Sequence, residues 1–423
     1  MRKVLVITYY WPPAGGPGVQ RWLKFVKYLQ DFNIEPIVYI PDNPHYPLVD
    51  ESFKADIPSN IKIYKHAIFE PYNLASIFSG KKTKRISSGL INTKDQSFLE
   101  KVMLWIRGNL FIPDARKYWI KPSVRFLNTI IEEETIDTII TSGPPHSLHL
   151  IGLQLQKKLN VKWIADFRDP WTSIGYHKKL KLTNYAQKRH KQLETLVLRS
   201  ADKLLVTSRT TKAEFSSITS KPIEVITNGY DNQKIEGLPL DQFFSISHIG
   251  SMLTGRNPLN LWKALSELIQ EHPTFKEKLK LQFIGVVSDD VWESISEFGL
   301  QEFTEFLGYL SHEEAVIYQQ KSQVLLLVEI DSEETKGIIP GKLFEYMLAE
   351  RPILGIGPEN WEVATMVSET KSGFVFNYKA HIQLKNVLLD WFGQYQNQSL
   401  HIDPVKTEHY SRRELTRKLA AYI

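Results

Sequence analysis

Polar residues that could do chemistry follow two apolar runs in the first half of the chain. Asp166, Arg168 and Asp169 come directly after one run, and His146 follows the preceding run. Carboxylates and imidazoles can exchange protons or orient hydroxyl groups, and an arginine between two carboxylates can pair with them or bind an anion. These four residues are our catalytic candidates. A packing or helix-capping role is the alternative for His146, and mutual ion pairing is the alternative for the other three.

A glycine-rich turn follows the first apolar run of the chain. Gly15 and Gly16 precede a segment whose apolar residues recur at helical spacing, namely Val19, Trp22, Val26 and Leu29. A turn of this kind lets backbone N–H groups approach an anion at the start of a helix. It lacks the G-x-G-x-x-G spacing and a Walker lysine, which disfavours a dinucleotide or ATP site. We predict that Gly15 and Gly16 contact an anion, with an ordinary tight loop as the alternative.

A second turn of this type, in the last third of the chain, ends in Gly341 and leads into a helix. The positive end of the helix dipole suits a pyrophosphate or a sugar hydroxyl. Glu345 lies one turn inside the helix, where its carboxylate can accept two hydrogen bonds from a ribose diol. Two alternatives stay open. Glu345 can simply be an acid that the helix dipole favours near the start of a helix, and Lys342, directly after Gly341, can simply be a solvated lysine.

The elements that position these residues alternate between short Val- and Ile-rich runs and segments of helical periodicity. This alternation is typical of a parallel α/β fold. The runs form two series, and we expect each series to make one Rossmann-like domain. The expected strands are 4–7, 36–40, 138–141, 162–165, 203–207 and 223–226, then 245–249, 280–284, 303–307, 324–328, 353–355 and 373–376.

The segment between the two series, residues 231–243, is polar and contains Gly237 and Pro239, which is typical of a linker. We predict an N-terminal domain over residues 1–236 and a second domain over residues 237–405. Residues 406–423 are expected to form a C-terminal helix that begins near Ser411 and packs on either domain, including a return to the first.

The composition is that of a folded two-domain protein. The chain has 423 residues, of which 42% are hydrophobic and 23% are charged, and it contains no cysteine. The absence of cysteine excludes disulfides and thiolate chemistry. A net charge of +5 is too small to indicate nucleic acid as a partner. Basic residues cluster at residues 81–85 and 178–191, either as solvated surface or as sites for phosphate or anionic lipid.

Apolar runs in the sequence are short. The first covers only about four residues, less than the core of a signal peptide, and none approaches the roughly 20 residues of a membrane span. We expect a cytoplasmic protein, with peripheral contact to the inner face of the membrane as an option. Residues 53–123 fit the alternation poorly and mix Trp105, Tyr118 and Trp119 with basic residues. Core packing and contact with an acceptor or a membrane both remain open for them.

Motifs in the same order and spacing as in family 4 glycosyltransferases of the GT-B fold run along nearly the whole chain. The opening Tyr9-Tyr10-Trp11-Pro12-Pro13-Ala14-Gly15-Gly16 resembles that of the family. Further resemblances are carried by Ala201 to Ser208, by Ile226 to Asp231, by Ile249 to Pro258, and by Pro340 to Ala349 followed by Arg351-Pro352-Ile353-Leu354.

The resemblance implies two Rossmann-like domains with parallel sheets facing a central cleft. A nucleotide diphosphate sugar would be a substrate, held mainly by the second domain, and no cofactor would be needed. The donor-binding residues that it implies are Gly15, Gly16, Asn228, Gly250, Arg256, Gly341, Lys342 and Glu345. Arg256 would clamp the diphosphate, Lys342 would face the phosphates, and Glu345 would bind the ribose.

The sequence departs from the family pattern at three points. Gly337 stands where a second glutamate is common, Ser251 stands where a first basic residue is common, and no histidine lies near Asp166. The chain has no D-x-D tripeptide, so we predict no metal site. Such enzymes generally retain the anomeric configuration, and the departing phosphate can accept the acceptor's proton, so that no enzymic base is obligatory.

The resulting prediction is a retaining glycosyltransferase that uses a glycan or lipid-linked acceptor in surface polysaccharide synthesis. Two alternatives remain: a UDP-sugar epimerase with the same fold, and a non-catalytic binding protein that keeps the fold. An epimerase would turn over a nucleotide sugar without an acceptor.

Overall fold

The computed structural model describes residues 1–70, 98–178, 180–231 and 234–423. The basic cluster at residues 81–85 lies outside them. The chain divides into two compact units, the first comprising Met1–Thr227 with Arg412–Ile423 and the second Asn228–Ser411. The division falls between Thr227 and Asn228, whereas the linker composition predicts it after residue 236.

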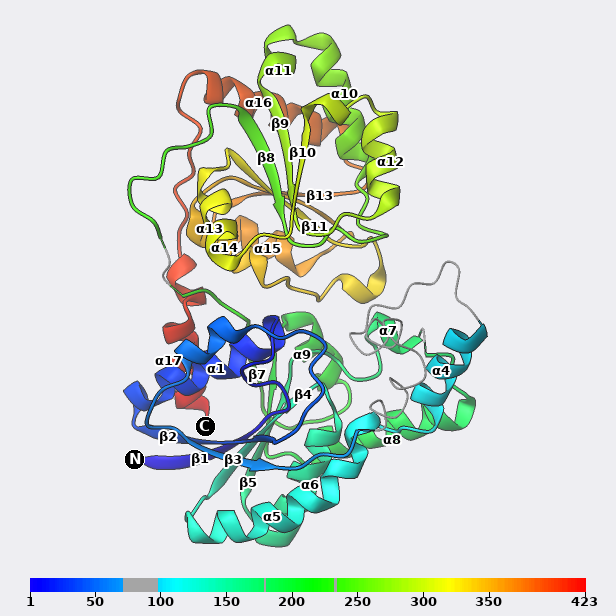
Figure 1. Ribbon diagram of the computed structural model, residues 1–423, viewed down its shortest axis with the longest axis vertical. Coiled ribbons are helices and arrows are strands. Elements are labelled where there is room, and N and C mark those ends of the chain that lie inside the picture. The colour runs from blue at the N-terminus through cyan, green and yellow to red at the C-terminus, as the bar shows by residue number, and fades with distance from the viewer. Residues whose placement is uncertain (71–97, 179, 232–233) are drawn as a thin grey trace. The chain divides into compact units, whose positions relative to one another are not determined.

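The sheet of the first unit has seven parallel strands in the order β3-β2-β1-β4-β5-β6-β7 (Figure 1). The strands are β1 (Arg2–Ile7), β2 (Ile34–Pro41), β3 (Lys62–His66), β4 (Thr138–Gly143), β5 (Lys162–Phe167), β6 (Lys203–Val206) and β7 (Ile223–Val225). The sequence pattern predicts all of them except β3. This edge strand has Lys-Ile-Tyr-Lys-His in place of an apolar run, since an edge strand is only partly covered.

Helices cover both faces of this sheet (Figure 1). They are α1 (Pro17–Leu29), α5 (Ile120–Glu133), α6 (Ser147–Leu159), α8 (Asn184–Ser200), α9 (Arg209–Ser216) and α17 (Arg412–Tyr422). Two further helices, α4 (Phe98–Asn109) and α7 (Gly175–Lys178), lie to one side of the sheet near α8 (Figure 1). The four apolar residues predicted to face the core from α1 are all fully buried. Exposed residues of α8 include Lys188, Arg189 and Lys191, which makes that part of the second basic cluster a solvated helix face.

The C-terminal helix α17 packs on the first unit. Its Leu415 and Leu419 lie in the same apolar cluster as Val19 and Trp22 of α1. Lys418 forms an ion pair of 2.8 Å with Glu224 of β7. The chain therefore leaves the first unit at Thr227 and returns to it for its last helix.

The sheet of the second unit has six parallel strands in the order β10-β9-β8-β11-β12-β13. They are β8 (Phe244–Ile249), β9 (Leu279–Ile284), β10 (Thr304–Gly308), β11 (Val324–Val328), β12 (Ile353–Gly357) and β13 (Gly373–Asn377). All six are predicted by the sequence pattern. The α/β class with two parallel, Rossmann-like sheets is confirmed.

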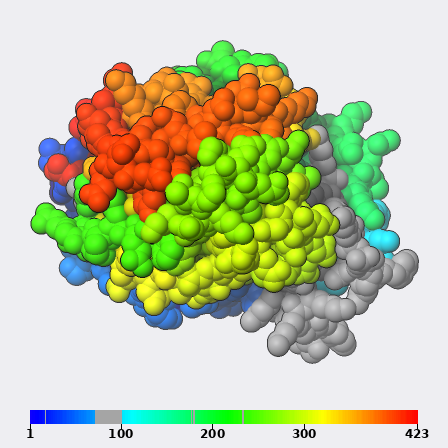
Figure 2. All heavy atoms as spheres, turned by 90° about the horizontal axis from the view of Figure 1, so that it is seen from above, coloured from blue at the N-terminus to red at the C-terminus, as the bar shows by residue number. Residues whose placement is uncertain are grey.

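Seven helices cover the sheet of the second unit among the described residues. They are α10 (Leu259–Glu271), α11 (Pro273–Lys278), α12 (Asp289–Glu297), α13 (His312–Lys321), α14 (Lys342–Ala349), α15 (Glu362–Glu369) and α16 (His381–Gln396). Helices α16 and α10 pack against each other. In Figure 2, residues of α16 (orange-red) and of α10 to α12 (yellow-green) lie side by side on the surface of this unit.

Each sheet contains one point at which the strand order reverses. In the first unit the chain runs outward from β1 to one edge and from β4 to the other; in the second, β8 and β11 are the two central strands. The loops that follow two such strands diverge, and the crevice between them at the carboxyl ends is where open α/β sheets bind ligands. The candidate sites therefore lie after β1 and β4 and after β8 and β11.

Residues 98–123 belong to the stretch that fits the alternation of strands and helices poorly. They include both buried core residues and exposed aromatic residues. Leu104 and Trp119 are buried in the core, while Trp105 and Tyr118 are 42% and 48% exposed. Part of this stretch is therefore ordinary packing, and part presents aromatic rings to the surface.

Candidate functional site

The loop that follows β8 is fixed close to the start of α14. Gly250 has a φ of 108°, a conformation that side chains rarely adopt. A side chain at this position would also lie 3.2 Å from Lys342 Nζ. The next turn of the loop is anchored by Asn257, which donates from its amide to Asp290 O at 3.0 Å and to Ser294 Oγ at 2.8 Å. Glycine at position 250 thus leaves room for the lysine, and Asn257 fixes the adjacent Arg256.

A buried carboxylate at the end of β11 orients Arg256. The guanidinium donates from Nε and Nη2 to Glu329 at 2.9 to 3.1 Å. The Glu329 side chain is 1% exposed and that of Arg256 is 27% exposed. Nη1 of Arg256 makes no hydrogen bond to the described residues. The guanidinium is thus held by one edge, and its other edge can bind an anionic ligand.

Helix α14 is fixed to both central strands by Tyr346. Its buried hydroxyl accepts a hydrogen bond from Ile249 N at 3.0 Å and lies 3.4 Å from Leu326 O. Lys342 occupies the first position of the helix, and its Nζ lies 3.1 Å from His248 Nε2. Burial, followed by the charge of Arg256, lowers the pKa of Lys342 to about 7. The site thus contains a permanent cation, Arg256, and a lysine that loses its charge more easily than usual.

The other predicted donor residues of the second unit are less strongly fixed. Glu345 is partly buried and accepts a hydrogen bond of 2.8 Å from Gln319 Nε2 on α13 through Oε2 only. Gly341 has open space around its Cα, since an added Cβ would meet nothing within 4 Å. Asn228 is the first residue of the second unit, and within the described chain its side chain makes no hydrogen bond. The structure brings Gly250, Arg256, Lys342 and Glu345 to one edge of one sheet.

In the first unit, the glycine turn after β1 is occupied by its own chain. Gly15 N donates to Leu48 O at 2.9 Å, so this N–H is not available to an anion. Gly16, with a φ of 89°, is the N-cap of α1 and has no side-chain cap. The predicted contact with an anion therefore rests on Gly16 and the first turn of α1, and no longer on Gly15.

Asp166 is a structural residue by its contacts. Its carboxylate is fully buried and forms an ion pair of 2.8 Å with the equally buried Arg21. It also accepts hydrogen bonds of 2.8 Å from Trp22 Nε1 and Ser142 Oγ. Burial alone would raise the pKa of Asp166, but the charge and hydrogen bonds of Arg21 outweigh it and lower the pKa. The geometry favours anchoring of α1 over contact with a substrate.

Arg168 and Asp169 lie on the less buried side of the same cluster. Arg168 donates to the carbonyl groups of Gly18 and Pro144 and lies over the ring of Tyr10 at 5.5 Å. Asp169 makes no hydrogen bond to the described residues, and burial raises its pKa. Of the four catalytic candidates, Asp169 is the carboxylate that can accept a hydrogen bond from a ligand.

His146 is packed among other aromatic rings. It stacks on Trp171 with a centroid distance of 4.6 Å and an interplanar angle of 3°, and it is 5% exposed with both ring nitrogens unpaired. Burial lowers its pKa well below the ordinary value. His149 and His177 beside it have pKa values lowered by burial to about 3 and about 4. These contacts favour the packing role for His146.

The buried histidines predict acid sensitivity of the first unit. Their pKa values in the folded chain lie below the unfolded value near 6.5. Between about pH 6.5 and pH 4 the unfolded chain therefore binds more protons, and the free energy of unfolding decreases as the pH is lowered. We expect the melting temperature to drop across this window. His146→Phe, which retains the stacking on Trp171, should reduce the drop; identical pH profiles for the two proteins would contradict this.

Two site residues carry sequence signals too weak to single them out. Glu329 is a lone carboxylate directly after a five-residue apolar strand, and His248 is a lone histidine inside the strand β8. Their importance depends on their partners, Arg256 and Lys342, which come from other elements. Among the described residues, no group of three or more histidine, aspartate or glutamate side chains is arranged to hold a metal ion.

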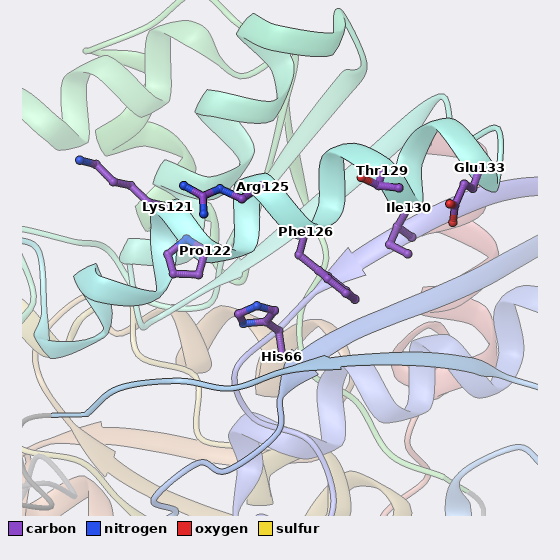
Figure 3. A pocket seen from close by; sticks show the side chains of 8 residues that line it. All are labelled: His66, Lys121, Pro122, Arg125, Phe126, Thr129, Ile130 and Glu133. Atoms are coloured by element: carbon purple, nitrogen blue, oxygen red, sulfur yellow. The ribbon is translucent and has the colours of Figure 1, made fainter.

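A groove of about 690 Å³ lies between the end of β3 and the exposed side of α5 in the first unit (Figure 3). Its lining residues are His66, Lys121, Pro122, Arg125, Phe126, Thr129, Ile130 and Glu133. Phe69 lies just after the end of β3, and Tyr118 lies just before the start of α5. Their exposed rings are in edge contact with each other. We call Phe69, Tyr118, Lys121 and Arg125 the basic aromatic surface.

Comparisons with known proteins found a family match to part of the sequence and solved structures with a similar fold. Residues 92–234 match the model of Glycosyltransferase Family 4. A glycosyltransferase structure from Rickettsia africae is similar, with a TM-score of 0.60, 14% identity and coverage of 100% of this chain and 97% of that one. The Anabaena protein HepE in complex with UDP has a TM-score of 0.57 at 12% identity, covering 99% and 95%. No curated protein sequence matches the chain.

The same fold is also found in a putative UDP-N-acetylglucosamine 2-epimerase from Listeria monocytogenes, with a TM-score of 0.54, 13% identity and coverage of 99% and 95%. At these identities the similarity shows the fold. The predicted resemblance to GT-B proteins of family 4 is confirmed, and the chemistry must be argued from the site itself.

Proposed function

We propose that this chain, which has the GT-B fold and a family 4 glycosyltransferase segment, transfers a sugar from a nucleoside diphosphate sugar to a hydroxyl group of an acceptor. The observation that carries the proposal is the arrangement after β8 and β11, where Arg256 is held by the buried Glu329 and Lys342 begins α14 beside Gly250. Two cationic side chains and a helix N-terminus at a strand-order reversal suit a diphosphate.

The donor would be held by residues of the second unit. Nη1 of Arg256 and the Nζ of Lys342 would bind the diphosphate oxygens, with the first N–H groups of α14 beyond Gly341. Glu345 has one oxygen bonded to Gln319, and its other oxygen would accept a hydrogen bond from the ribose. Gly250 keeps the loop close to Lys342, and Asn228 stays a proposed contact at the start of the unit.

The transfer would proceed with retention of configuration. The bond between the anomeric carbon and the diphosphate oxygen breaks while a bond forms to the acceptor oxygen, and the acceptor's proton passes to the departing phosphate. Positive charges held in place stabilise the negative charge that develops on the leaving group. Arg256 and Lys342 supply this charge in the proposal, which therefore involves no metal ion.

The acceptor would be held by the first unit, where Asp169 is the available carboxylate beside Arg168. Replacing Asp169 by asparagine is expected to lower kcat/KM for transfer by about 10- to 100-fold, because acceptor hydroxyls lose their orientation. Donor affinity should be unchanged. Asp137→Asn is the matched control, since Asp137 is 68% exposed and lies at the opposite end of the sheet, just before β4. Equal loss in both variants would contradict the assignment.

A glycan or lipid-linked acceptor in surface polysaccharide synthesis fits the basic aromatic surface. Exposed aromatic rings beside lysine and arginine suit the interface of an anionic membrane. No helix in the described parts of the chain is long and apolar enough to cross a membrane. From the basic aromatic surface we propose peripheral contact with the inner face of the membrane, and we propose no nucleic acid as a partner.

The proposed function is tested by a melting-temperature screen with UDP, GDP, ADP and CDP and their sugars. One nucleotide class should raise the melting temperature clearly, and Glu345→Gln should reduce that rise while the unliganded protein melts as before. No rise with any of the eight compounds would overturn the proposal.

A sugar-nucleotide epimerase is the second candidate, because an epimerase structure shares the fold. Incubating the protein with the stabilising nucleotide sugar alone separates the two functions. An epimerase would form a new sugar isomer without an acceptor. The transferase that we propose would return the donor unchanged apart from slow hydrolysis.

A further inference from the structure

His248 has a fixed orientation inside the second unit. It is fully buried in β8, and its Nδ1 lies 3.0 Å from the carbonyl oxygen of Leu326. A carbonyl only accepts, so Nδ1 carries the proton and Nε2 presents a lone pair. The backbone carbonyl of Ser251 also faces the ring, but burial dominates and the pKa of His248 lies well below its ordinary value. His248 is therefore a neutral acceptor.

The group that this acceptor faces is the amine of Lys342. The distance from Nζ to Nε2 is 3.1 Å, and among the described residues no carboxylate lies within hydrogen-bonding distance of Nζ. Glu329, which follows β11, binds Arg256, and Glu345, on the same helix as Lys342, accepts from Gln319. The remaining charged neighbour is the guanidinium of Arg256, from the loop after β8, which repels a second cation.

A lysine in these surroundings loses its proton at lower pH than usual. Burial and the charge of Arg256 lower its pKa to about 7, while Glu329 and Glu345 offset part of this effect. The N-terminal end of α14 adds positive potential at the same place. A diphosphate would reverse the balance, because two negative charges next to Nζ favour the protonated amine.

We propose that Lys342 is a largely neutral amine in the empty site above neutral pH, with His248 as the positioning residue that holds its Nζ in place, and that the diphosphate of the donor draws a proton from solvent onto Lys342 as it binds. The inference rests on the proposed function. It adds a proton to the donor-binding equilibrium and gives a role to a buried histidine that the transfer itself does not use.

The inference gives donor affinity a defined pH dependence. The empty site has the lower pKa and the occupied site the higher one, so binding takes up a proton between these two values. Affinity is then highest below about pH 7 and falls above it, by up to about tenfold per pH unit. A nucleotide sugar is the suitable probe, because its phosphodiester groups do not titrate near neutral pH, unlike the terminal phosphate of a free nucleoside diphosphate.

Calorimetry at pH 8 in HEPES and in Tris measures the proton uptake, because the two buffers release protons with different enthalpies and neither is a phosphate that could occupy the site. The probe is whichever of UDP-, GDP-, ADP- and CDP-glucose raises the melting temperature most. We expect the wild-type protein to take up most of one proton. Lys342→Arg should bind with no uptake, because a guanidinium does not titrate in this range.

Two variants of His248 test its positioning role. His248→Gln can place an acceptor near the position of Nε2 and should retain proton uptake. His248→Phe removes the acceptor, and it should weaken binding about tenfold and move the fall in affinity to lower pH. A purely structural role for His248 would lower the melting temperature without moving the pH profile.

The outcomes separate this inference from the proposed function. Binding without proton uptake in the wild-type protein, or equal uptake in Lys342→Arg, would overturn the inference and leave the donor site intact. If none of the four nucleotide sugars binds at any pH, the proposed function fails, and this inference fails with it.

Discussion

Replacing Arg256 with alanine is expected to weaken binding of the nucleotide sugar by about 100-fold, which corresponds to about 3 kcal/mol. Two effects add. The diphosphate loses hydrogen bonds from a charged donor, each worth about 1.5 to 3 kcal/mol. In addition, the carboxylate of Glu329, 1% exposed, loses its partner and repels the incoming phosphates. Isothermal calorimetry measures the loss directly.

The same substitution should also destabilise the second unit, so it needs a matched variant. Glu329→Gln combined with Arg256→Ala removes the unpaired charge. We expect this double variant to regain most of the melting temperature of the unliganded protein while binding stays weak. If the double variant binds as the wild-type protein does, Arg256 is no diphosphate ligand, and the loss in the single variant came from the buried charge alone.

Replacing Asp166 with asparagine is expected to destabilise the first unit by about 3 to 5 kcal/mol, the usual cost of removing one partner from a buried ion pair. Both Asp166 and Arg21 are fully buried. Arg21 also donates to the carbonyl groups of Ile226 and Thr227, so the loss would spread from α1 to the end of the first unit. Chemical denaturation followed by circular dichroism measures the change.

An exposed pair provides the control for this prediction. Arg413 and Asp31 form an ion pair of 3.1 Å with side chains 68% and 43% exposed, and Asp31→Asn should change stability by less than about 1 kcal/mol. If Asp166 were catalytic, as the sequence pattern suggests, the expected result would be the opposite one. If Asp166→Asn keeps full stability but abolishes transfer, Asp166 acts on the substrate, and the structural role that we assign to it is wrong.

The sequence predicts the strands well because buried parallel strands need continuous apolar runs. Each run that the sequence pattern singles out as a strand is one in the structure, and β3 was missed because its pattern, Lys-Ile-Tyr-Lys-His, belongs to an edge. The C-terminal helix was placed by Ser411 and its basic run. Its packing on α1 could not be predicted, because either unit offers an apolar surface to an amphipathic helix.

Within the site, the sequence identifies groups but not their partners. Arg256, Lys342 and Glu345 stand in recognisable motifs, whereas Glu329 and His248 matter only through tertiary contacts with two of them. Asp166 shows the reverse case. A carboxylate after a strand suggests chemistry, but the arginine that neutralises it comes from α1, 145 positions earlier in the chain, and no local pattern announces that pairing.

Hydrogen–deuterium exchange with and without the stabilising nucleotide sugar tests most directly the claim that the second unit holds the donor. We predict slower exchange in peptides that cover residues 249–257 and 338–346, where the loop after β8 and the start of α14 surround the proposed diphosphate position. Protection confined to the first unit, in peptides that cover residues 9–18 and 142–149, would contradict the account.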